Sequence, residues 1–398
     1  MAATAPPGVP AILYFGSFAT MTDRFAIAPL LIPIAASFGV SLAAVSGAAS
    51  LYYLAYGLMP PVYGVLSDRF GRVRVIRAAL VGTAVADVLS ALSPNLTALL
   101  VARFVTGAIA CGVWPTTLVY LGDRYPFKAR QQAITNVLVF VALGTTAGTL
   151  GAGLTAHVVS WRYFFLIPGS IALAVAIFLR GVPESLVARS NQNPIKQVAS
   201  VLRRGWAVFL LALAVLNGAV MFGFVTYLAP ALEANGQSPA IAGVVVAFYG
   251  LSVLVCTRGF GFVALRIPAA LILAGGAAFL MIGYLIAGAT QAVAAILAAS
   301  VLAGGAYAFM QSTFQTWATD VVPEARGTAT SLFSTAIFAG AALATAGVAG
   351  LASANRYSSL FVIAAIVTLP VLIIGSLARW QYPGSDAIVD TEAGRQIG

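Results

Sequence analysis

The chain has 398 residues, of which 61% are hydrophobic and 8% are charged, and its formal net charge is +10. Soluble globular domains carry about 25% charged residues, so the composition excludes that class. Continuous apolar runs of about 20 residues predict membrane-spanning helices and argue against an outer-membrane barrel, whose strands alternate in hydrophobicity. The expected fold class is an all-α membrane protein.

Twelve apolar windows, separated by short polar breaks, are predicted to cross the membrane. They lie near residues 11–36, 43–66, 75–93, 96–119, 131–156, 161–180, 206–232, 240–257, 268–287, 291–317, 328–351 and 357–379. The longest polar break separates six spans from six. We therefore expect a six-helix bundle over residues 1–180, a linker over 181–205, and a second six-helix bundle with a short cytoplasmic tail over 206–398.

Lys and Arg residues are distributed unevenly between the predicted loops. With the N-terminus in the cytoplasm, 17 of the 21 fall on the cytoplasmic side and 2 on the other, while Arg24 and Arg103 fall within spans. The positive-inside rule then predicts that both termini are cytoplasmic, in a bacterial plasma membrane. Topology explains the basic charge without a nucleic-acid partner. Residues 1–10 contain no Lys or Arg before the apolar run, so the first span is expected to be retained.

The first span carries two adjacent charges, Asp23 and Arg24, among apolar or small residues. A charge at the bilayer centre costs about 2.5–3.5 kcal/mol on insertion scales, so such residues are usually functional. Neighbours on a helix point about 100° apart, so we expect one to face a cavity and the other a neighbouring helix. Asp23 is the candidate proton carrier, because burial makes a carboxylate easier to protonate. Arg24 could hold that acid ionised or bind an anionic substrate, and a purely structural ion pair is the alternative.

Residues 64–74 read GVLSDRFGRVR. They resemble the loop signature of the major facilitator superfamily, G-x-L-x-D-R-x-G-R-x-R, which follows the second span. The resemblance implies a twelve-helix transporter in which two pseudo-symmetric bundles rock about a central site. Gly64 and Gly71 suit a close helix approach and a tight turn.

The same resemblance implies a conformational latch. Asp68 would contact the start of the eleventh span in the outward-open state, and Arg69 and Arg72 would pair with an acid at the end of the fourth span, here Asp123. The counterpart in the second half, residues 256–266, has no acid. The latch is therefore expected on one side only.

Two further segments resemble superfamily patterns. Residues 102–115 match the R-x-x-x-G pattern of the fourth span, which implies that Arg103 influences the protonation of a nearby acid; snorkelling of Arg103 to the outer surface is the alternative. Residues 142–154 resemble the antiporter signature G-x-x-x-G-P-x-x-G-G of exporters, but Thr149 replaces its proline and Ala152 one of its glycines. Close helix packing is expected at Gly144, Gly148, Gly151 and Gly153.

Several spans carry aromatic, amide or thioether side chains at helical spacing on one face, as suits a cavity for amphipathic ligands. The candidates for lining a substrate cavity are Trp114, Asn136, Phe140, Asn217, Met221, Phe224, Tyr307, Gln311 and Gln315, with Phe314 on the same face. Ordinary helix packing is the alternative for each. Asp87 is a further acid at mid-depth of the third span, either a proton carrier or a structural, hydrogen-bonded group.

The two halves of the chain repeat one another. Asp320 follows Asp123 by 197 residues, and Pro323 follows Pro126 by the same 197 residues. An internal repeat of this length implies two similar bundles with a pathway between them.

Other functional classes find no support in the sequence. Cys111 and Cys256 lie far apart in or beside apolar segments, and His157 is the single histidine, so neither a disulfide framework nor a clustered metal site is expected. The chain also lacks a nucleotide-binding loop and a Ser/His/Asp arrangement. We expect no enzymatic activity, no cofactor and no metal.

The favoured interpretation is a proton-coupled secondary transporter that exports small amphipathic compounds by alternating access. The alternative is uptake or exchange of an organic anion, which rests on Arg24, Arg103 and the altered antiporter signature. A non-transporting receptor with the same fold is a third interpretation. The expected partners are a small-molecule substrate, protons and the lipid bilayer, and the protein is expected to be a monomer.

Overall fold

The computed structural model describes residues 9–185, 194–264 and 266–382, and every regular element among them is helical. The helices of the first half are α1 (Ile12–Phe38), α2 (Leu42–Leu58), α3 (Pro60–Phe70), α4 (Arg72–Ala91), α5 (Leu96–Ala110), α6 (Trp114–Arg124), α7 (Phe127–Val158) and α8 (Trp161–Phe178). The linker contains one helix, α9 (Pro194–Leu202).

The second half has the same architecture. Its helices are α10 (Gly205–Gly218), α11 (Leu228–Ala234), α12 (Pro239–Ala264), α13 (Ala269–Ala289), α14 (Val293–Asp320), α15 (Arg326–Gly347), α16 (Ala349–Ser353), α17 (Tyr357–Pro370) and α18 (Ser376–Gln381). A π-helical turn, Ala219–Gly223, follows α10, and a second one, Val371–Gly375, joins α17 to α18. Such turns insert one extra residue into the helical register.

In the described part of the chain, ten or eleven of the twelve predicted spans meet the criteria of length and composition. Ten are long and apolar enough to cross a membrane, and α2 with α3 forms an eleventh span that is bent by 49°. The bend lies at Met59, just before Pro60, whose ring cannot continue an undistorted helix. Helix α4 has the length of a twelfth span but carries Arg74, Arg77 and Asp87, so its composition alone does not identify it.

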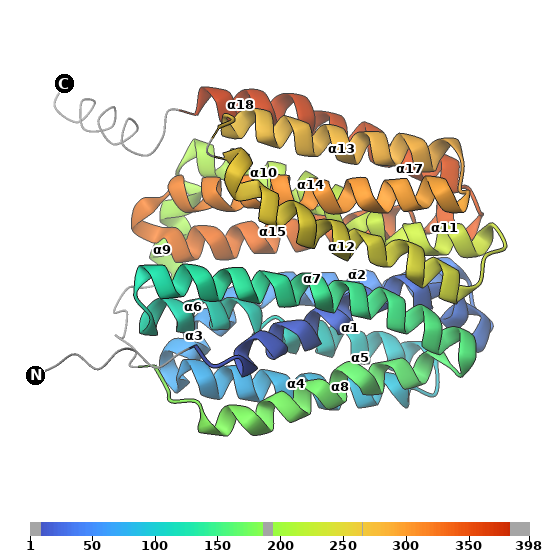
Figure 1. Cartoon of the computed structure of the whole chain (residues 1–398), viewed down its shortest axis with the longest axis horizontal. Coiled ribbons are helices and arrows are strands. Elements are labelled where there is room, and N and C mark those ends of the chain that lie inside the picture. The colour runs from blue at the N-terminus through green and yellow to red at the C-terminus, as the bar shows by residue number, and fades with distance from the viewer. Residues whose placement is uncertain (1–8, 186–193, 265, 383–398) are drawn as a thin grey trace, which may run out of the picture.

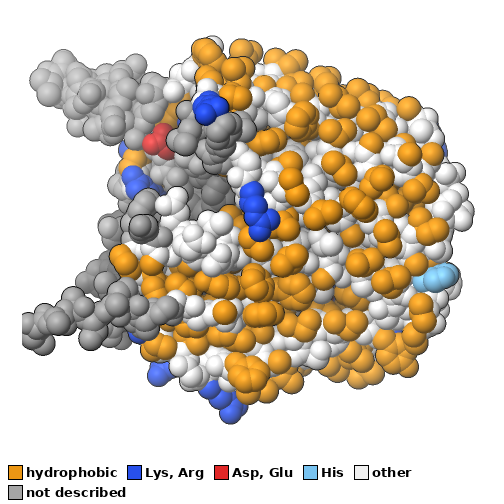
Figure 2. All heavy atoms as spheres, viewed as in Figure 1, with side chains coloured by type: hydrophobic (Ala, Val, Ile, Leu, Met, Phe, Trp, Pro, Cys, Tyr) orange, Lys and Arg blue, Asp and Glu red, His pale blue; other side chains and the backbone are white. Residues whose placement is uncertain are grey.

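Hydrophobic side chains cover the middle of the molecule. Figure 2 shows them over most of one face, while the Lys and Arg side chains visible there lie toward the end at which α1 begins. We call this the basic end and the opposite one the far end. Large apolar side chains such as Val101, Phe178 and Leu343 are exposed outward, as suits contact with lipid chains.

The helices form two bundles that lie side by side (Figure 1). In the first bundle α1 packs on α7 and α8, and α2 packs on α5. In the second, α10 packs on α15, and α12 and α13 both pack on α14. Between the bundles, the main contacts are α2 with α15 and α7 with α12. The central site therefore lies where α1, α2 and α7 meet the second bundle.

Equivalent close approaches support the internal repeat. A Cβ atom on Gly107 would lie 2.4 Å from the carbonyl oxygen of Tyr52, and one on Gly304 would lie 2.3 Å from that of Tyr249. Gly304 follows Gly107 by 197 residues, and Tyr249 follows Tyr52 by the same number, which is also the offset within the internal repeat. The two bundles thus use the same backbone contact between equivalent helices.

This contact leads to a stability prediction. We expect Gly107→Ala to lower stability by about 1–3 kcal/mol, because the added methyl group meets backbone that cannot rotate away. Gly122→Ala is the matched control, since nothing lies within 4 Å of a Cβ at that helical glycine. Thermal unfolding of both purified variants tests the prediction, and equal midpoints would contradict it.

Candidate functional site

Asp23 and Arg103 form an ion pair inside the first bundle. A guanidinium nitrogen of Arg103 in α5 lies 2.5 Å from one carboxylate oxygen of Asp23 in α1, and a second nitrogen lies 3.2 Å from the other oxygen. Both side chains are completely buried. Arg103 therefore does not snorkel to the surface, because its charge is compensated by the carboxylate within the bundle.

Asp87 of α4 joins this pair. Its carboxylate lies 3.7 Å from the same Arg103 nitrogen, and neither of its oxygens has a hydrogen-bond partner among the described residues. The rings of Tyr52 and Phe165 lie 4.7 and 5.0 Å from the Arg103 guanidinium and shield it from either side. We call Asp23, Asp87 and Arg103 the charge cluster, which brings two carboxylates to one buried cation.

The second bundle has no counterpart of the charge cluster. The repeat places Val220, Ser300 and Tyr284 at the positions of Asp23, Arg103 and Asp87. The Tyr284 hydroxyl donates a hydrogen bond to the backbone oxygen of Val220, so a neutral contact joins the positions that the two carboxylates hold in the first bundle. Any chemistry of the cluster thus belongs to the first bundle.

Arg24 points away from the cluster, toward the second bundle. Its guanidinium carbon lies 4.8–5.9 Å from the centres of four rings, which we call the aromatic cage: Phe25, Tyr56, Phe222 and Phe338. An Arg24 terminal nitrogen contacts the sulfur of Met21, and its Nε has no partner within the described ranges. Each cation–π contact contributes about 0.5–2 kcal/mol, which offsets part of the cost of burying the charge. Adjacent residues on α1 therefore have separate environments.

A narrow cavity lies beside Arg24, between the bundles. Arg24, Tyr53 and Thr149 line it from the first bundle, and Phe222 and Tyr249 are among the side chains that line it from the second. It has room for about one water molecule at most in this conformation. The rings around Arg24 therefore leave no room there for a larger molecule in this conformation.

None of the nine side chains predicted to line a substrate cavity lines this one. The π-helical turn explains part of the difference, because it shifts the helical register within the segment that contains Met221. Phe222 therefore reaches Arg24, while Met221 is fully buried and Phe224 packs on Tyr284 of α13, at 6.1 Å between ring centres. A straight helix, assumed in the prediction, does not reproduce this arrangement.

The remaining candidates lie at different distances from the cage. Tyr307 is the nearest by contact, because its ring packs on Phe222 at 5.9 Å. Phe140 packs on Tyr14 and Phe15 within the first bundle. Asn136 accepts a hydrogen bond from Gln132, and the Gln311 amide nitrogen lies 3.5 Å from the Gln315 amide oxygen. Trp114 is partly buried at the start of α6.

Asn217 is fully buried in α10, and its amide has no hydrogen-bond partner in the part of the chain that the structure describes.

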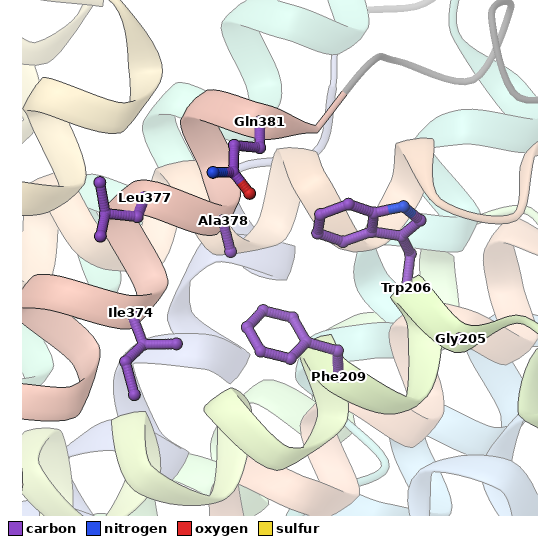
Figure 3. Close-up of a pocket in the computed structure, with 7 residues that line it drawn as sticks. All are labelled: Gly205, Trp206, Phe209, Ile374, Leu377, Ala378 and Gln381. Carbon is purple, nitrogen blue, oxygen red and sulfur yellow. The ribbon is translucent and has the colours of Figure 1, made fainter.

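A wider pocket lies elsewhere, within the second bundle. Figure 3 shows Trp206 and Phe209 of α10 opposite Ile374 and Leu377 near α18, around an open groove at the basic end. Its lining residues all belong to the second bundle. This groove is not part of a pathway between the bundles.

The comparisons with known proteins agree with this architecture. A family model described as Major Facilitator Superfamily matches residues 13–345 and 228–394. The chain belongs to the major facilitator superfamily. Its two helical bundles have the superfamily's fold.

Its curated relatives match over part of their length. A triacylglyceride transporter of Mycolicibacterium smegmatis is 27% identical over 44% of this chain and 32% of its own length. The niacin transporter NiaP of Acinetobacter baylyi is 28% identical over 39% and 35%. The quinolone resistance protein NorB of Staphylococcus aureus is 25% identical over 37% and 32%. The matched region spans about a third of each relative.

Solved structures match over nearly the whole chain. The nucleoside transporter NupG superposes with a TM-score of 0.77 at 13% identity, over 93% of this chain and 99% of its own. A bacterial homologue of the human lysosomal transporter Spinster, in an inward-facing conformation, gives 0.72 at 19% identity, over 92% and 95%. At such identities the likeness establishes the fold alone.

The superfamily loop at residues 64–74 forms a polar cluster at the basic end. Arg72 Nε lies 3.1 Å from a carboxylate oxygen of Asp123, and another Arg72 nitrogen lies 2.5 Å from Asp68. Arg69 stacks on Phe70 at 5.4 Å. Asp68 thus has a partner within its own bundle in this conformation.

Gly64 does not make the close helix approach expected of it. Nothing lies within 4 Å of a Cβ there, because α3 is bent away from α2. Gly71 does form a turn: its φ of 99° strains other residues, and a Cβ would lie 2.7 Å from the carboxyl carbon of Glu184.

Glu184, which the sequence analysis missed, caps α4. Its carboxylate accepts hydrogen bonds from the backbone N–H groups of Val73 and Arg74 at 2.8 and 3.2 Å. A negative group at this position also interacts favourably with the helix dipole. The Tyr120 hydroxyl donates to the neighbouring Pro183 carbonyl at 3.1 Å. Because Glu184 follows α8 by several residues and acts on α4, no local motif indicated it.

The cap leads to a second stability prediction. Glu184→Ala should destabilise the protein by about 1 kcal/mol, because two backbone N–H groups at the start of α4 lose their acceptor. Glu184→Gln should lose less, since its amide oxygen can still accept. Thermal unfolding of the three proteins tests this order, and an alanine variant as stable as the natural protein would contradict it.

The four glycines of the antiporter-like segment contact three different helices. Gly144 and Gly148 lie against the backbone of α1, with Cβ positions 2.5 and 2.4 Å from the carbonyl oxygens of Phe18 and Thr22. Gly151 faces Phe164 of α8, and Gly153 lies against α12 of the second bundle, 2.3 Å from the Pro239 oxygen.

The segment's departures from the antiporter signature also have structural consequences. Thr149, in place of the proline, lines the cavity and lies in an uninterrupted α7. The fully buried Ala152 replaces the first of the paired glycines.

Proposed function

We propose that the protein is a proton-coupled secondary transporter that exports small amphipathic compounds by alternating access. The observation that carries the proposal is the charge cluster, which lies one residue along α1 from the interbundle cavity. Two carboxylates and one guanidinium have a net charge of −1, so the cluster is neutral when it holds one proton. Binding and release of that proton is the proposed coupling step.

The coupling follows from the position of α1. Asp23 faces Arg103 inside the first bundle, and Arg24 faces the cavity, so a change in one environment rotates or shifts the other. When the charge cluster loses its proton, its extra negative charge favours the arrangement in which Arg24 lies closest to the cluster. When it regains the proton, Arg24 is free to bind a ligand or to remain in the cage.

The bundles contact one another through α7 and α12, and toward the basic end through α3 and α15. The close contacts between α7 and α12 involve Gly153 and Gly243 in the half of the molecule near the far end. At the basic end nothing lies within 4 Å of the Cβ positions of Gly122 and Gly327. We propose that the far end is extracellular and sealed, and that the basic end and both termini are cytoplasmic, in a bacterial plasma membrane. We further propose that the monomer is the working unit.

The names of the relatives fit small amphipathic substrates in either direction. NorB is a quinolone resistance protein, which supports export, and NiaP is a niacin transporter. Export remains our proposal, and uptake or exchange of an organic anion is the second candidate. The absence of a carboxylate beside Arg24, among the described residues, favours that candidate.

Flux in everted membrane vesicles tests the proposal. The probes are one anionic, one neutral and one cationic fluorescent amphipathic dye, measured with and without a pH gradient across the vesicle membrane. We expect the protein to accelerate the movement of at least one dye, and to do so only when the gradient is present. Movement that is independent of the gradient, or no acceleration of any dye over vesicles without the protein, would contradict it.

A further inference from the structure

We infer that Arg24 and the aromatic cage bind the anionic group of a flat organic monoanion, such as an aromatic carboxylate or sulfonate. The inference rests on the proposed function and deepens it, because it assigns a charge and a shape to the amphipathic substrate. It starts from a contrast between two buried arginines. Arg103 has two carboxylates within 4 Å, whereas Arg24 has none in the described part of the chain.

The surroundings of Arg24 leave room for an anionic partner. Its Nε is buried without an acceptor, and its contact with the Met21 sulfur is a weak one. Asp23, its neighbour in sequence, pairs with Arg103 inside the first bundle. A carboxylate or sulfonate accepts charge-assisted hydrogen bonds from a guanidinium, and a second unpartnered polar group, the buried Tyr249 hydroxyl, belongs to the lining of the same cavity.

The rings around Arg24 indicate the shape of the ligand. Phe25 and Tyr56 come from the first bundle, and Phe222 and Phe338 come from the second. The ring centres of Phe222 and Phe338 lie 5.5 Å apart in a stacked arrangement. The flat ring of a ligand could stack in the same way in place of either side chain. In this conformation the cage rings occupy the space beside the cation, so the ligand's own ring would replace them as the bundles separate.

The charge of the ligand follows from the count of charges. Arg24 is the only cation lining the cavity, and none of the lining residues is acidic. One negative charge therefore makes the site neutral, whereas a neutral ligand leaves the cation uncompensated and a cation adds to it. Because the ligand would touch both bundles, binding would also bias their relative position.

Binding to the purified full-length protein tests the inference. The probes are benzoate and benzenesulfonate, with benzamide as the neutral and benzyltrimethylammonium as the cationic counterpart of similar size. We expect at least one anion to bind about tenfold or more tightly than both counterparts, the ratio that one charge-assisted hydrogen bond supplies. Isothermal calorimetry gives the affinities, and the thermal unfolding midpoint reports binding independently.

Three variants identify the site. Arg24→Met should reduce anion affinity by about tenfold or more, and Arg24→Lys should retain part of it because the charge remains. Arg356→Met, exposed just before α17, is the matched control and should leave the affinity unchanged. The inference is overturned if neither anion binds, if benzamide or benzyltrimethylammonium binds as tightly, or if Arg24→Met binds the anions as well as the natural protein does.

The two proposals fail in different ways. Gradient-driven movement of a neutral or cationic dye, with no anion binding, would overturn the inference and leave proton-coupled transport intact. Anion binding that depends on Arg24, together with flux that ignores the pH gradient, would support the inference and overturn the coupling.

Discussion

Asp23→Asn is expected to abolish transport driven by a pH gradient while leaving the protein folded. The fold survives because Arg103 keeps one carboxylate, that of Asp87, 3.7 Å away. Coupling is lost because the charges of the remaining carboxylate and the guanidinium sum to zero without a bound proton. The cluster therefore no longer gains and loses a proton. We expect gradient-driven dye movement in everted vesicles to fall to the level of vesicles without the protein.

The same reasoning applies to Asp87→Asn, which leaves the Asp23–Arg103 pair intact. Glu233→Gln is the matched control: Glu233 is another carboxylate whose oxygens are buried without a partner, but it lies in α11, outside the cluster. It should keep its gradient dependence. Full gradient-driven transport by Asp23→Asn would disprove the coupling role.

Removing the cation of the cluster should have the largest effect on stability. Arg103→Met leaves Asp23 and Asp87 buried together without a compensating charge, since both have side chains that are completely inaccessible. Removing one partner of a buried ion pair typically costs about 3–5 kcal/mol. We therefore expect a low yield of folded protein and a marked drop in the thermal unfolding midpoint.

A second substitution separates charge from packing. In the double variant Arg103→Met with Asp23→Asn, one buried carboxylate is gone, so much of the lost stability should return. The Asp23→Asn substitution therefore stabilises the Arg103→Met variant, although in the natural protein the same substitution only removes an ion pair. If the single variant is as stable as the natural protein, or if the second substitution makes it less stable still, the electrostatic account of the cluster is wrong.

The fold was accessible from the sequence because its signals are local. Apolar length, loop charge and the motif at residues 64–74 predicted an all-α membrane protein of the major facilitator type, and the family match and the fold comparison confirm that fold. The different directions of Asp23 and Arg24 also followed from helix geometry alone. These features depend on neighbours in sequence.

The rest of the site depends on how helices bring distant residues together. Asp87 and Arg103 lie on different helices, and nothing in either segment indicates that they approach within 4 Å. No local motif indicates the π-helical turn that directs Phe222 toward Arg24, so a regular helical period selected Met221 and Phe224 instead. Glu184 reaches α4 from beyond α8. Each difference arises from tertiary packing.

The central claim is that the charge cluster holds one exchangeable proton, and infrared spectroscopy of the reconstituted protein tests it without a substrate. The measurement is the carbonyl stretch of protonated carboxylic acids near neutral pH, in a Glu233→Gln background that removes a second buried acid. We predict a band that is absent from both Asp23→Asn and Asp87→Asn. A spectrum without that band, or a band that persists unchanged in both variants, would contradict the account.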